Sequence, residues 1–169
     1  MSDVTIRMAV PGDIETLCSL ILEHGPNPWN HLPPDEVTAH LNGIADGAVQ
    51  AVVADRDGAL LGFVSYQLSR YFDRYQPPER RDQLHAYICE AVTHRAATGQ
   101  GLGSRLLSQA VERLVEQGIT DIYIDRHEEN AASAGMMRKA GFVEIETYTD
   151  LQRRPNGSRR TTVCCFRSA

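Results

Sequence analysis

The segment AVTHRAATGQGLGSRLL, residues 91–107, carries three glycines at alternate positions just before a leucine-rich run. Glycine lacks a Cβ atom, so it accepts positive φ angles and lets another molecule approach the backbone closely. A turn of this kind between a strand and a helix also presents unpaired backbone N–H groups, and the helix dipole adds partial positive charge there. We therefore expect a phosphate-bearing ligand to bind at this turn.

Two familiar phosphate-binding patterns do not fit these glycines. A Walker loop needs a lysine, and the only lysine of the chain is Lys139, so hydrolysis of ATP or GTP is disfavoured. The dinucleotide pattern GxGxxG has a third glycine where Ser104 stands, which disfavours a nicotinamide-dependent oxidoreductase. A tight turn without a ligand is a further alternative, but three alternate glycines exceed what such a turn needs.

The elements that must position this turn follow from the apolar periodicity. An apolar stripe at helical spacing follows the glycines and ends at Gly118. Asp-Gly between two apolar runs predicts a hairpin, and PNGS predicts a second one near the end of the chain. The predicted strands cover 4–10, 48–55, 59–70, 85–92, 121–125 and the two arms around PNGS, and the predicted helices begin near Asp13, Pro34, Gly101 and Asn130.

This order of elements joins hairpins with one strand–helix–strand unit around the glycine turn. It predicts an α/β (α+β) fold: a mixed, mostly antiparallel sheet of six to seven strands, flanked by about four helices. The segment 71–83 is long for a hairpin connection. It either covers a site, forms a subunit interface of a homodimer, or is a plain surface excursion.

The composition suits one globular domain over residues 1–169. The chain is 42% hydrophobic and 23% charged, close to the averages for such proteins, and it is long enough to bury a core without disulfides. Its cysteines form no CxxC pair, so we expect reduced thiols and no metal site. They are Cys18, Cys89, Cys164 and Cys165.

Charge and hydropathy restrict the location and the partners. The net charge of −5 disfavours nucleic acid, because proteins that bind it usually display a basic face. The start of the chain lacks the apolar run of a signal peptide, and no stretch approaches the ~20 apolar residues of a membrane span. We therefore expect a cytoplasmic protein without membrane contact. Basic residues gather in LQRRPNGSRR, 151–160, which we interpret as a solvated hairpin.

The glycine segment resembles the signature of the GNAT superfamily of N-acetyltransferases, [QR]-x-x-G-x-[GA] at the start of a helix. The match here is Thr98-Gly99-Gln100-Gly101-Leu102-Gly103, with Thr98 where Gln or Arg is usual. A second segment is similar to the family in the spacing of an asparagine, a residue seven positions on, and a closing Gly-Phe. These residues are Asn130, Met137, Gly141 and Phe142.

The resemblance implies acetyl-coenzyme A (acetyl-CoA) as co-substrate and no metal. The pyrophosphate would be held by backbone N–H groups from Thr98 to Ser104, with Asn130 and Met137 also near the cofactor. The pantetheine arm would run along the strand edge near Val92, hydrogen bonding like an added strand. The backbone N–H of Val92 would also meet the oxyanion of the reaction.

Transfer to an amine requires a deprotonated nitrogen, and Glu90 is the first candidate for the base. It is a carboxylate in the middle of the apolar run 85–92, and strict alternation predicts that it shares a face with Ile88 and Val92. Glu90 could instead orient the acceptor or pair with an arginine such as Arg126. His94 is the second candidate base, because an unperturbed imidazole titrates near neutral pH.

The general acid is not assigned by the resemblance. Many family members carry a tyrosine that can protonate the leaving thiolate, and Met137 stands at that position here. Solvent, Tyr123 or Tyr148 could replace it.

The acceptor side is expected to come from variable loops on a fixed scaffold. Trp29 and His31 lie in one such loop, Tyr71 lies in the long segment 71–83, and Tyr66 lies on a predicted strand. Trp29 could equally anchor its loop. These residues do not discriminate among amino acids, polyamines, aminoglycosides and protein N-termini.

Two functions follow from these observations. The first is an acetyl-CoA-dependent N-acetyltransferase that moves the acetyl group to a primary amine of a small molecule or peptide by direct transfer. The alternative is a non-catalytic acyl-CoA binding or sensing module, which the residues Thr98 and Met137 motivate.

Overall fold

The structure, a computed structural model, describes residues 3–168. Its strands are β1 (Thr5–Met8), β2 (Gln50–Arg56), β3 (Ala59–Ser69), β4 (His85–Thr93), β5 (Asp121–His127), β6 (Val143–Thr149) and β7 (Arg160–Arg167). Its α-helices are α1 (Ile14–His24), α2 (Pro34–Asn42), α3 (Leu102–Glu116) and α4 (Ala131–Lys139). These elements agree with the order expected from the sequence.

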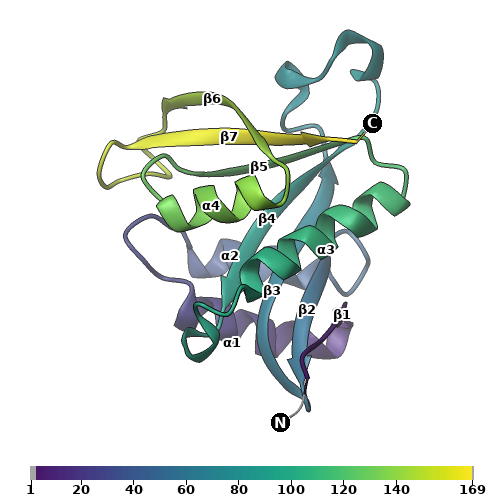
Figure 1. The fold of residues 1–169 in the computed structure, drawn as a ribbon, viewed down its shortest axis with the longest axis vertical. Helices are drawn as coiled ribbons and strands as arrows, with labels where there is room; N and C mark the ends of the chain where they lie inside the picture. The colour runs from purple at the N-terminus through teal and green to yellow at the C-terminus, as the bar shows by residue number, and fades with distance from the viewer. Residues whose placement is uncertain (1–2, 169) are drawn as a thin grey trace.

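The strands form one seven-stranded sheet in the order β1-β2-β3-β4-β5-β7-β6. Neighbouring strands are antiparallel except β4 and β5, which are joined through α3 and run parallel. The prediction of a mixed, mostly antiparallel sheet with helices on its faces is therefore confirmed (Figure 1).

Helices cover both faces of the sheet, and each face has its own apolar core. The buried stripe of α3, with Leu106, Leu107 and Ala110, packs on Val64 and Ile88 in one core. The other core joins α1 and α2 to the opposite face of the sheet. Its members include Leu17, Ile21, Val37, Leu41, Val53, Phe63 and Val92.

The sheet separates between its two parallel strands. Residues Ala86–Ile88 of β4 pair with Ile122–Ile124 of β5, and no later residue of β4 pairs with β5 in the part of the chain that the structure describes. Figure 1 shows β4 continuing alongside β3 while β5, β7 and β6 diverge. After Ile88, the edge of β4 that faces β5 is therefore unpaired.

A β-bulge in β4 puts Glu90 and Ile88 on opposite faces of the sheet. Ser65 of β3 pairs with Glu90, but the next residue, Tyr66, pairs with Ile88, so Cys89 is unmatched. An extra residue reverses the alternation beyond it. Ile88 consequently packs in the α3 core, whereas Val92 packs in the core of α1 and α2. The expectation that Ile88, Glu90 and Val92 share a face was wrong, because strict alternation does not hold across the bulge.

The structure also bears on membranes and metals. Within residues 3–168, no helix combines the length and the apolar character that crossing a membrane requires. The same residues contain no group of three or more His, Cys, Asp or Glu side chains arranged to hold a metal ion.

Candidate functional site

The glycine turn has the backbone that a ligand cradle requires. Gly99 and Gly101 adopt φ angles of +85° and +74°, and Gly101 caps α3, which begins at Leu102. A Cβ atom at either glycine would project into open space, so neither is explained by crowding from the protein. Gly103 differs, because its Cβ would lie 3.2 Å from Met136 Sδ, and its small size lets α3 approach α4. Thr98 and Gln100 are exposed, and Ser104 is half-buried in the first turn of α3.

A small cavity of about 140 Å³ lies between the unpaired edge of β4 and the two helices α3 and α4. One wall is Ala91–Thr93 of β4, and the other includes Gly103, Ser133 and Met136. The cavity therefore leads from the start of α3 along the edge of β4. An extended chain could add to that edge by backbone hydrogen bonds.

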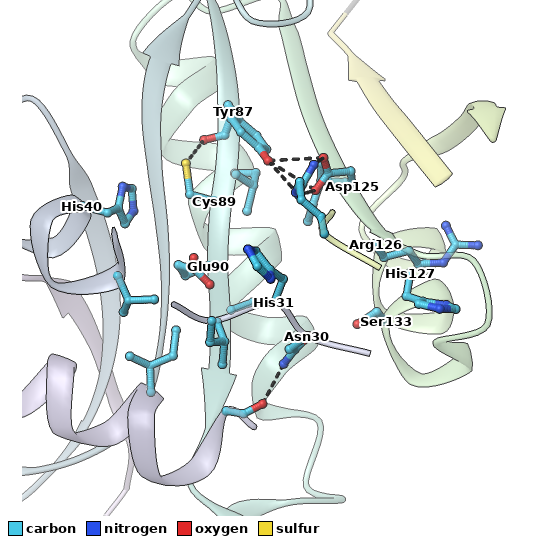
Figure 2. A pocket seen from close by; sticks show the side chains of 18 of the residues that line it. Asn30, His31, His40, Tyr87, Cys89, Glu90, Asp125, Arg126, His127 and Ser133 are labelled. Carbon is cyan, nitrogen blue, oxygen red and sulfur yellow. Dashed lines mark hydrogen bonds and ion pairs between the residues drawn. The ribbon is translucent and has the colours of Figure 1, made fainter. Parts of the chain in front are cut away.

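A large cavity of about 390 Å³ lies where β4 and β5 separate (Figure 2). Residues 87–91 of β4 and 124–127 of β5 line it, together with α4, α2 and the loop between α1 and α2. Ala91, Ser133 and Met136 line both cavities. The two spaces thus meet at the unpaired edge of β4.

Glu90 lies in the wall of the large cavity, next to this meeting point. Burial raises the pKa of its carboxyl to about 7, and the nearby negative charge of Asp125 acts in the same direction. Arg126 does not pair with it, since the Arg126 guanidinium binds Glu144 at 2.8 Å and points away from Glu90 (Figure 2). Glu90 is therefore a carboxyl group that can gain or lose a proton near neutral pH.

Sequence reasoning missed an ion-pair network on the opposite wall. Asp125, whose side chain is only 6% exposed, accepts hydrogen bonds from Arg153 at 3.0 and 3.1 Å and from the Tyr87 hydroxyl at 3.2 Å. Arg154 lies 3.7 Å from Asp125 and donates to the Thr161 hydroxyl at 2.8 Å. Part of the basic run 151–160 therefore faces the cavity and is not a purely solvated hairpin. The sequence signal for this network was Asp125, an acidic residue that directly follows the apolar run IYI.

Three loops join beside the cavity. The Trp29 ring packs on His127, with ring centroids 4.6 Å apart, and the Trp29 carbonyl accepts a hydrogen bond from Arg154 at 3.2 Å. Asn156 donates to the Pro28 carbonyl at 2.9 Å and accepts from His127 at 2.7 Å. We call these contacts the three-loop junction. It anchors the loop that carries His31.

The predicted acceptor residues divide into two groups. His31 and Tyr71 line the large cavity, and Figure 2 shows His31 in the same space as Glu90. Trp29 and Tyr66 are not in the lining. The structure places Trp29 in the three-loop junction. Tyr66, 1% exposed, lies in the α3 core, because alternation along β3 puts it on the same face as Val64.

His94, the second candidate base, lies outside both cavity linings. Its Nδ1 accepts the Ala96 N–H at 3.0 Å, and its ring lies against His24 with centroids 3.8 Å apart. His94 thereby caps the short 3₁₀ turn Arg95–Ala97, which precedes the glycine turn. Its catalytic role stays a prediction.

Asn130 and Met137, which the second motif predicts to lie near the cofactor, line the large cavity, and their contact with the cofactor stays a prediction. Asn130 caps α4 through its side-chain oxygen, which accepts the Ser133 N–H at 3.2 Å. Met137 is 4% exposed and packs in the α3 core. Tyr123, an alternative acid, is fully buried and donates to Gln76 instead.

Comparison with known proteins agrees with this geometry. The family model of the acetyltransferase (GNAT) family matches residues 14–142. The chain is 26% identical over 148 residues to phosphinothricin N-acetyltransferase of Alcaligenes faecalis. The aligned region covers 83% of this chain and 70% of that protein.

Solved structures show the same fold at low identity. The ribosomal-protein-S18-alanine N-acetyltransferase of Escherichia coli matches with a TM-score of 0.75 at 15% identity, covering 98% of this chain and 94% of that one. A Salmonella typhimurium structure with its cofactor acetyl-CoA matches with a TM-score of 0.71 at 19% identity, with the same coverage of 98% and 94%. The family match spans both motifs and the strands between them, and the chain therefore belongs to the GNAT acetyltransferase family.

Proposed function

We propose that this protein is an acetyl-CoA-dependent N-acetyltransferase that transfers the acetyl group directly to a primary amine of a small molecule. The observation that carries the proposal is Glu90. Its carboxyl has a pKa raised to about 7 and lies in the wall of the large cavity, beside the residues that both cavities share. A base with a pKa near the operating pH is suited to taking a proton from an amine.

The residues around the glycine turn fit acetyl-CoA. Gly99 and Gly101 leave open space for phosphate oxygens, and the backbone N–H groups of 98–104 would donate to them. The small cavity would hold the pantetheine arm along Ala91–Thr93, with the Val92 N–H as the candidate donor to the oxyanion. When bound, acetyl-CoA supplies the activated acetyl group.

Glu90 would act as the proton acceptor. An alkyl ammonium ion has a pKa near 10, so at neutral pH the acceptor must lose a proton before its nitrogen can attack. The nitrogen then bonds to the acetyl carbon, the carbon–sulfur bond breaks, and its electron pair passes to sulfur. An ammonium acceptor loses two protons overall: one reaches solvent and the other ends on the sulfur. Met137 has no group that can give this proton, so we assign it to solvent.

The large cavity favours a small acceptor. Its volume is about 390 Å³, and hydrogen bonds of the three-loop junction join the α1–α2 loop to the β6–β7 connection beside it. Such a volume is within the range of sites for small molecules. A long peptide would have to displace the hydrogen bonds that Arg154 and Asn156 donate to the carbonyls of Trp29 and Pro28.

The test is to mix the protein with acetyl-CoA and a panel of amines and to measure the release of free thiol. The panel would contain alkyl amines, amino acids, polyamines, aminoglycosides and short peptides with free N-termini. We expect thiol release with at least one small amine and a rise in Tm with acetyl-CoA alone. A rise in Tm without thiol release from any amine would favour the acyl-CoA binding module. Acetylation of peptides alone would contradict a small acceptor.

A further inference from the structure

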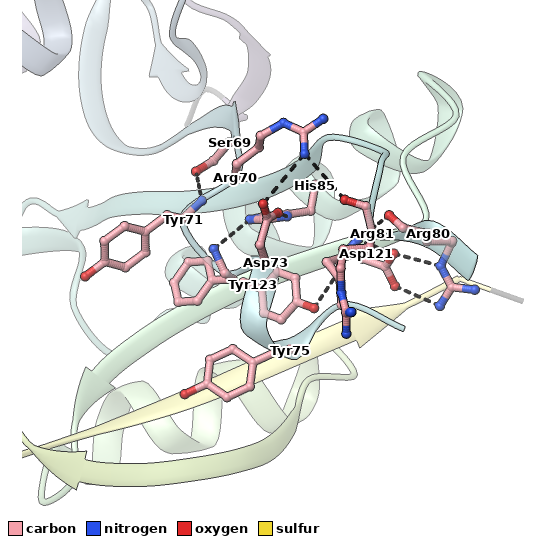
Figure 3. A network of polar contacts seen from close by, with 12 residues as sticks. Ser69, Arg70, Tyr71, Asp73, Tyr75, Arg80, Arg81, His85, Asp121 and Tyr123 are labelled. Atoms are coloured by element: carbon pink, nitrogen blue, oxygen red, sulfur yellow. Dashed lines mark hydrogen bonds and ion pairs between the residues drawn. The ribbon is translucent and has the colours of Figure 1, made fainter. Parts of the chain in front are cut away.

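The connection between β3 and β4, residues 70–84, is fixed to the sheet at several points (Figure 3). At its neck, the Arg70 guanidinium donates to the Asp82 carbonyl at 2.9 Å. Two short 3₁₀ turns, Asp73–Tyr75 and Pro78–Arg80, give the segment internal hydrogen bonds. We call this segment the β3–β4 loop. It is a built element of the fold and not a plain excursion.

Phe72 anchors the first half of the β3–β4 loop. Its side chain is fully buried, and its ring stacks on Tyr123 at 4.9 Å and meets the edge of Tyr87 at 4.8 Å between centroids. Its backbone N–H donates to His85 Nε2 at 3.0 Å, so the neutral His85 ring carries its proton on Nδ1. Burial lowers the pKa of His85, which favours this neutral form.

Asp121 anchors the second half. This carboxylate at the start of β5 is 3% exposed and accepts Arg80 Nε at 2.8 Å, Arg80 Nη2 at 3.1 Å and Gln76 Nε2 at 3.1 Å. Arg167 of β7 binds it from the other side. Gln76 is held in turn by the Tyr123 hydroxyl at 2.6 Å. We call Arg80, Gln76 and Asp121 the latch.

Tyr71 lies between this anchored segment and the large cavity. The residue is 54% exposed and lines the cavity, and its ring is stacked nearly parallel on Tyr87 with centroids 5.6 Å apart. Tyr87 in turn contacts Asp125 on the cavity wall. Within the described residues, no hydrogen bond to the Tyr71 hydroxyl is formed, so the neighbouring backbone and the Tyr87 ring hold this side chain. The same lining combines the apolar side chains of Ile21, Leu32 and Val37 with the charged ones of Glu90, Asp125 and Arg153, so Tyr71 and Tyr87 form one apolar patch in a cavity of mixed polarity.

We propose that the latch positions Tyr71 as a specificity-determining wall of the acceptor cavity, so that the protein prefers amines with an apolar body. The inference rests on the proposed function. Arg80 is a positioning residue: it touches neither cavity lining and acts through the loop that carries Tyr71. A ring held against Tyr87 offers a flat apolar surface to the acceptor without the entropy cost of ordering a free side chain.

The first experiment measures the latch without relying on activity. Arg80→Gln removes the paired hydrogen bonds to Asp121, and we expect faster hydrogen exchange at the Phe72 amide and its neighbours, with unchanged exchange in 102–116 of α3. Arg81→Gln is the matched control, because Arg81 is an exposed neighbour in the same loop. Arg80→Lys should restore part of the protection. Equal exchange in the Arg80→Gln and Arg81→Gln proteins would overturn the latch.

The second experiment links the latch to the acceptor, with 2-phenylethylamine as the apolar probe and ethanolamine as the polar one. Arg80→Gln and Tyr71→Ala should each raise KM for 2-phenylethylamine by about 3- to 10-fold, with kcat within about twofold, as loss of uniform binding does. KM for ethanolamine and the rise in Tm with acetyl-CoA should not change. The double variant should be no worse than Tyr71→Ala, because Arg80 acts through that ring.

Several outcomes would contradict this link. Additive effects in the double variant, a fall in kcat at constant KM, or a wild-type preference for ethanolamine would each overturn the role of Tyr71. A change in oligomeric state in Tyr71→Ala would instead assign the ring to a subunit contact. If no amine is acetylated, the proposed function fails and the specificity role fails with it, while the exchange experiment still decides whether the latch fixes the loop.

Discussion

The cofactor side and the acceptor side of this site are built in different ways. The glycine turn and the small cavity are built mainly from two short stretches, around 91–106 and 132–136, with Phe63 and Val64 of the adjacent strand β3 completing the cavity wall. The large cavity uses side chains from β4, β5, α2 and three loops, held by contacts such as Arg154 to Trp29, 125 positions apart. The first side is thus specified locally, and the second depends on the completed fold.

The largest effect is expected on the acceptor side, which is built from side chains. Glu90→Gln keeps the shape of the side chain and removes the base, so kcat should fall by about 10²- to 10⁴-fold. The rise in Tm caused by acetyl-CoA should stay, because the cofactor side is built from backbone. Glu112→Gln, on the exposed face of α3, is the control and should retain full activity.

If Glu90 only attracts a cationic acceptor, the same variant should raise KM and leave kcat unchanged. Higher pH should partly rescue a lost base, because more of the amine is then already deprotonated. Wild-type kcat and KM across pH 6 to 9 would remove Glu90 from the mechanism.

The complementary test changes the cofactor side at the glycine turn. Gly101→Val places a side chain in the open space of the turn and forces a β-branched residue toward a φ angle of +74°. We expect at least an approximately tenfold weaker affinity for acetyl-CoA, measured by the ligand-dependent rise in Tm. Gly47→Val is a matched control, because Gly47 also has a positive φ of +84° and open space around it but lines neither cavity.

Both glycine variants should lose some stability from backbone strain. The two must differ in ligand response, with Gly47→Val keeping the full rise in Tm. Equal responses would show that strain alone explains the loss at Gly101 and that the turn is not the anion site.

The smallest effect is expected from the electrostatic interaction between Asp125 and Glu90 on the acceptor side. Asp125→Asn removes a negative charge that raises the pKa of Glu90 and leaves Arg153 and Arg154 beside the cavity. The pKa of Glu90 should therefore fall from about 7. A base is active when deprotonated, so wild-type activity should decline as the pH falls through about 7, and the variant should keep more of its maximum at pH 6.

The pH profile of kcat/KM measures this shift, and Asp82→Asn, at an exposed position of the β3–β4 loop, should leave the profile unchanged. A profile for Asp125→Asn that matches the wild type would mean that the observed acid limb belongs to another group.

Sequence alone could predict the parts that repeat a period or a local turn. The stripe of α3 and the glycine spacing indicate a strand, a turn and a helix without any distant contact, and the structure has them at the expected residues. The same holds for the hairpins, whose turn residues lie between their own strands.

The acceptor side could be predicted only in part. His31 and Tyr71 line the cavity, but Tyr66 and Trp29 do not. Tyr66 lies on the α3 face of the sheet, whereas the bulge puts Glu90 on the other face, and loop contacts hold Trp29 outside the lining. Asp125, Arg153 and Arg154 were missed for the same reason: their meeting depends on the β6–β7 connection folding back over β5. Patterns along the chain do not contain such contacts.

The unmatched Cys89 makes β4 more sensitive to changes in length than to changes in composition. Removing Ala91, with Val92 kept opposite Phe63, would flatten the bulge and place Glu90 opposite Val64, so that its carboxyl would turn toward α3, into an apolar core. Replacing the Cys89 side chain leaves the number of residues unchanged and therefore leaves Glu90 in place. During evolution this strand should accept many exchanges at position 89, and even the loss of that residue, but no deletion of Ala91.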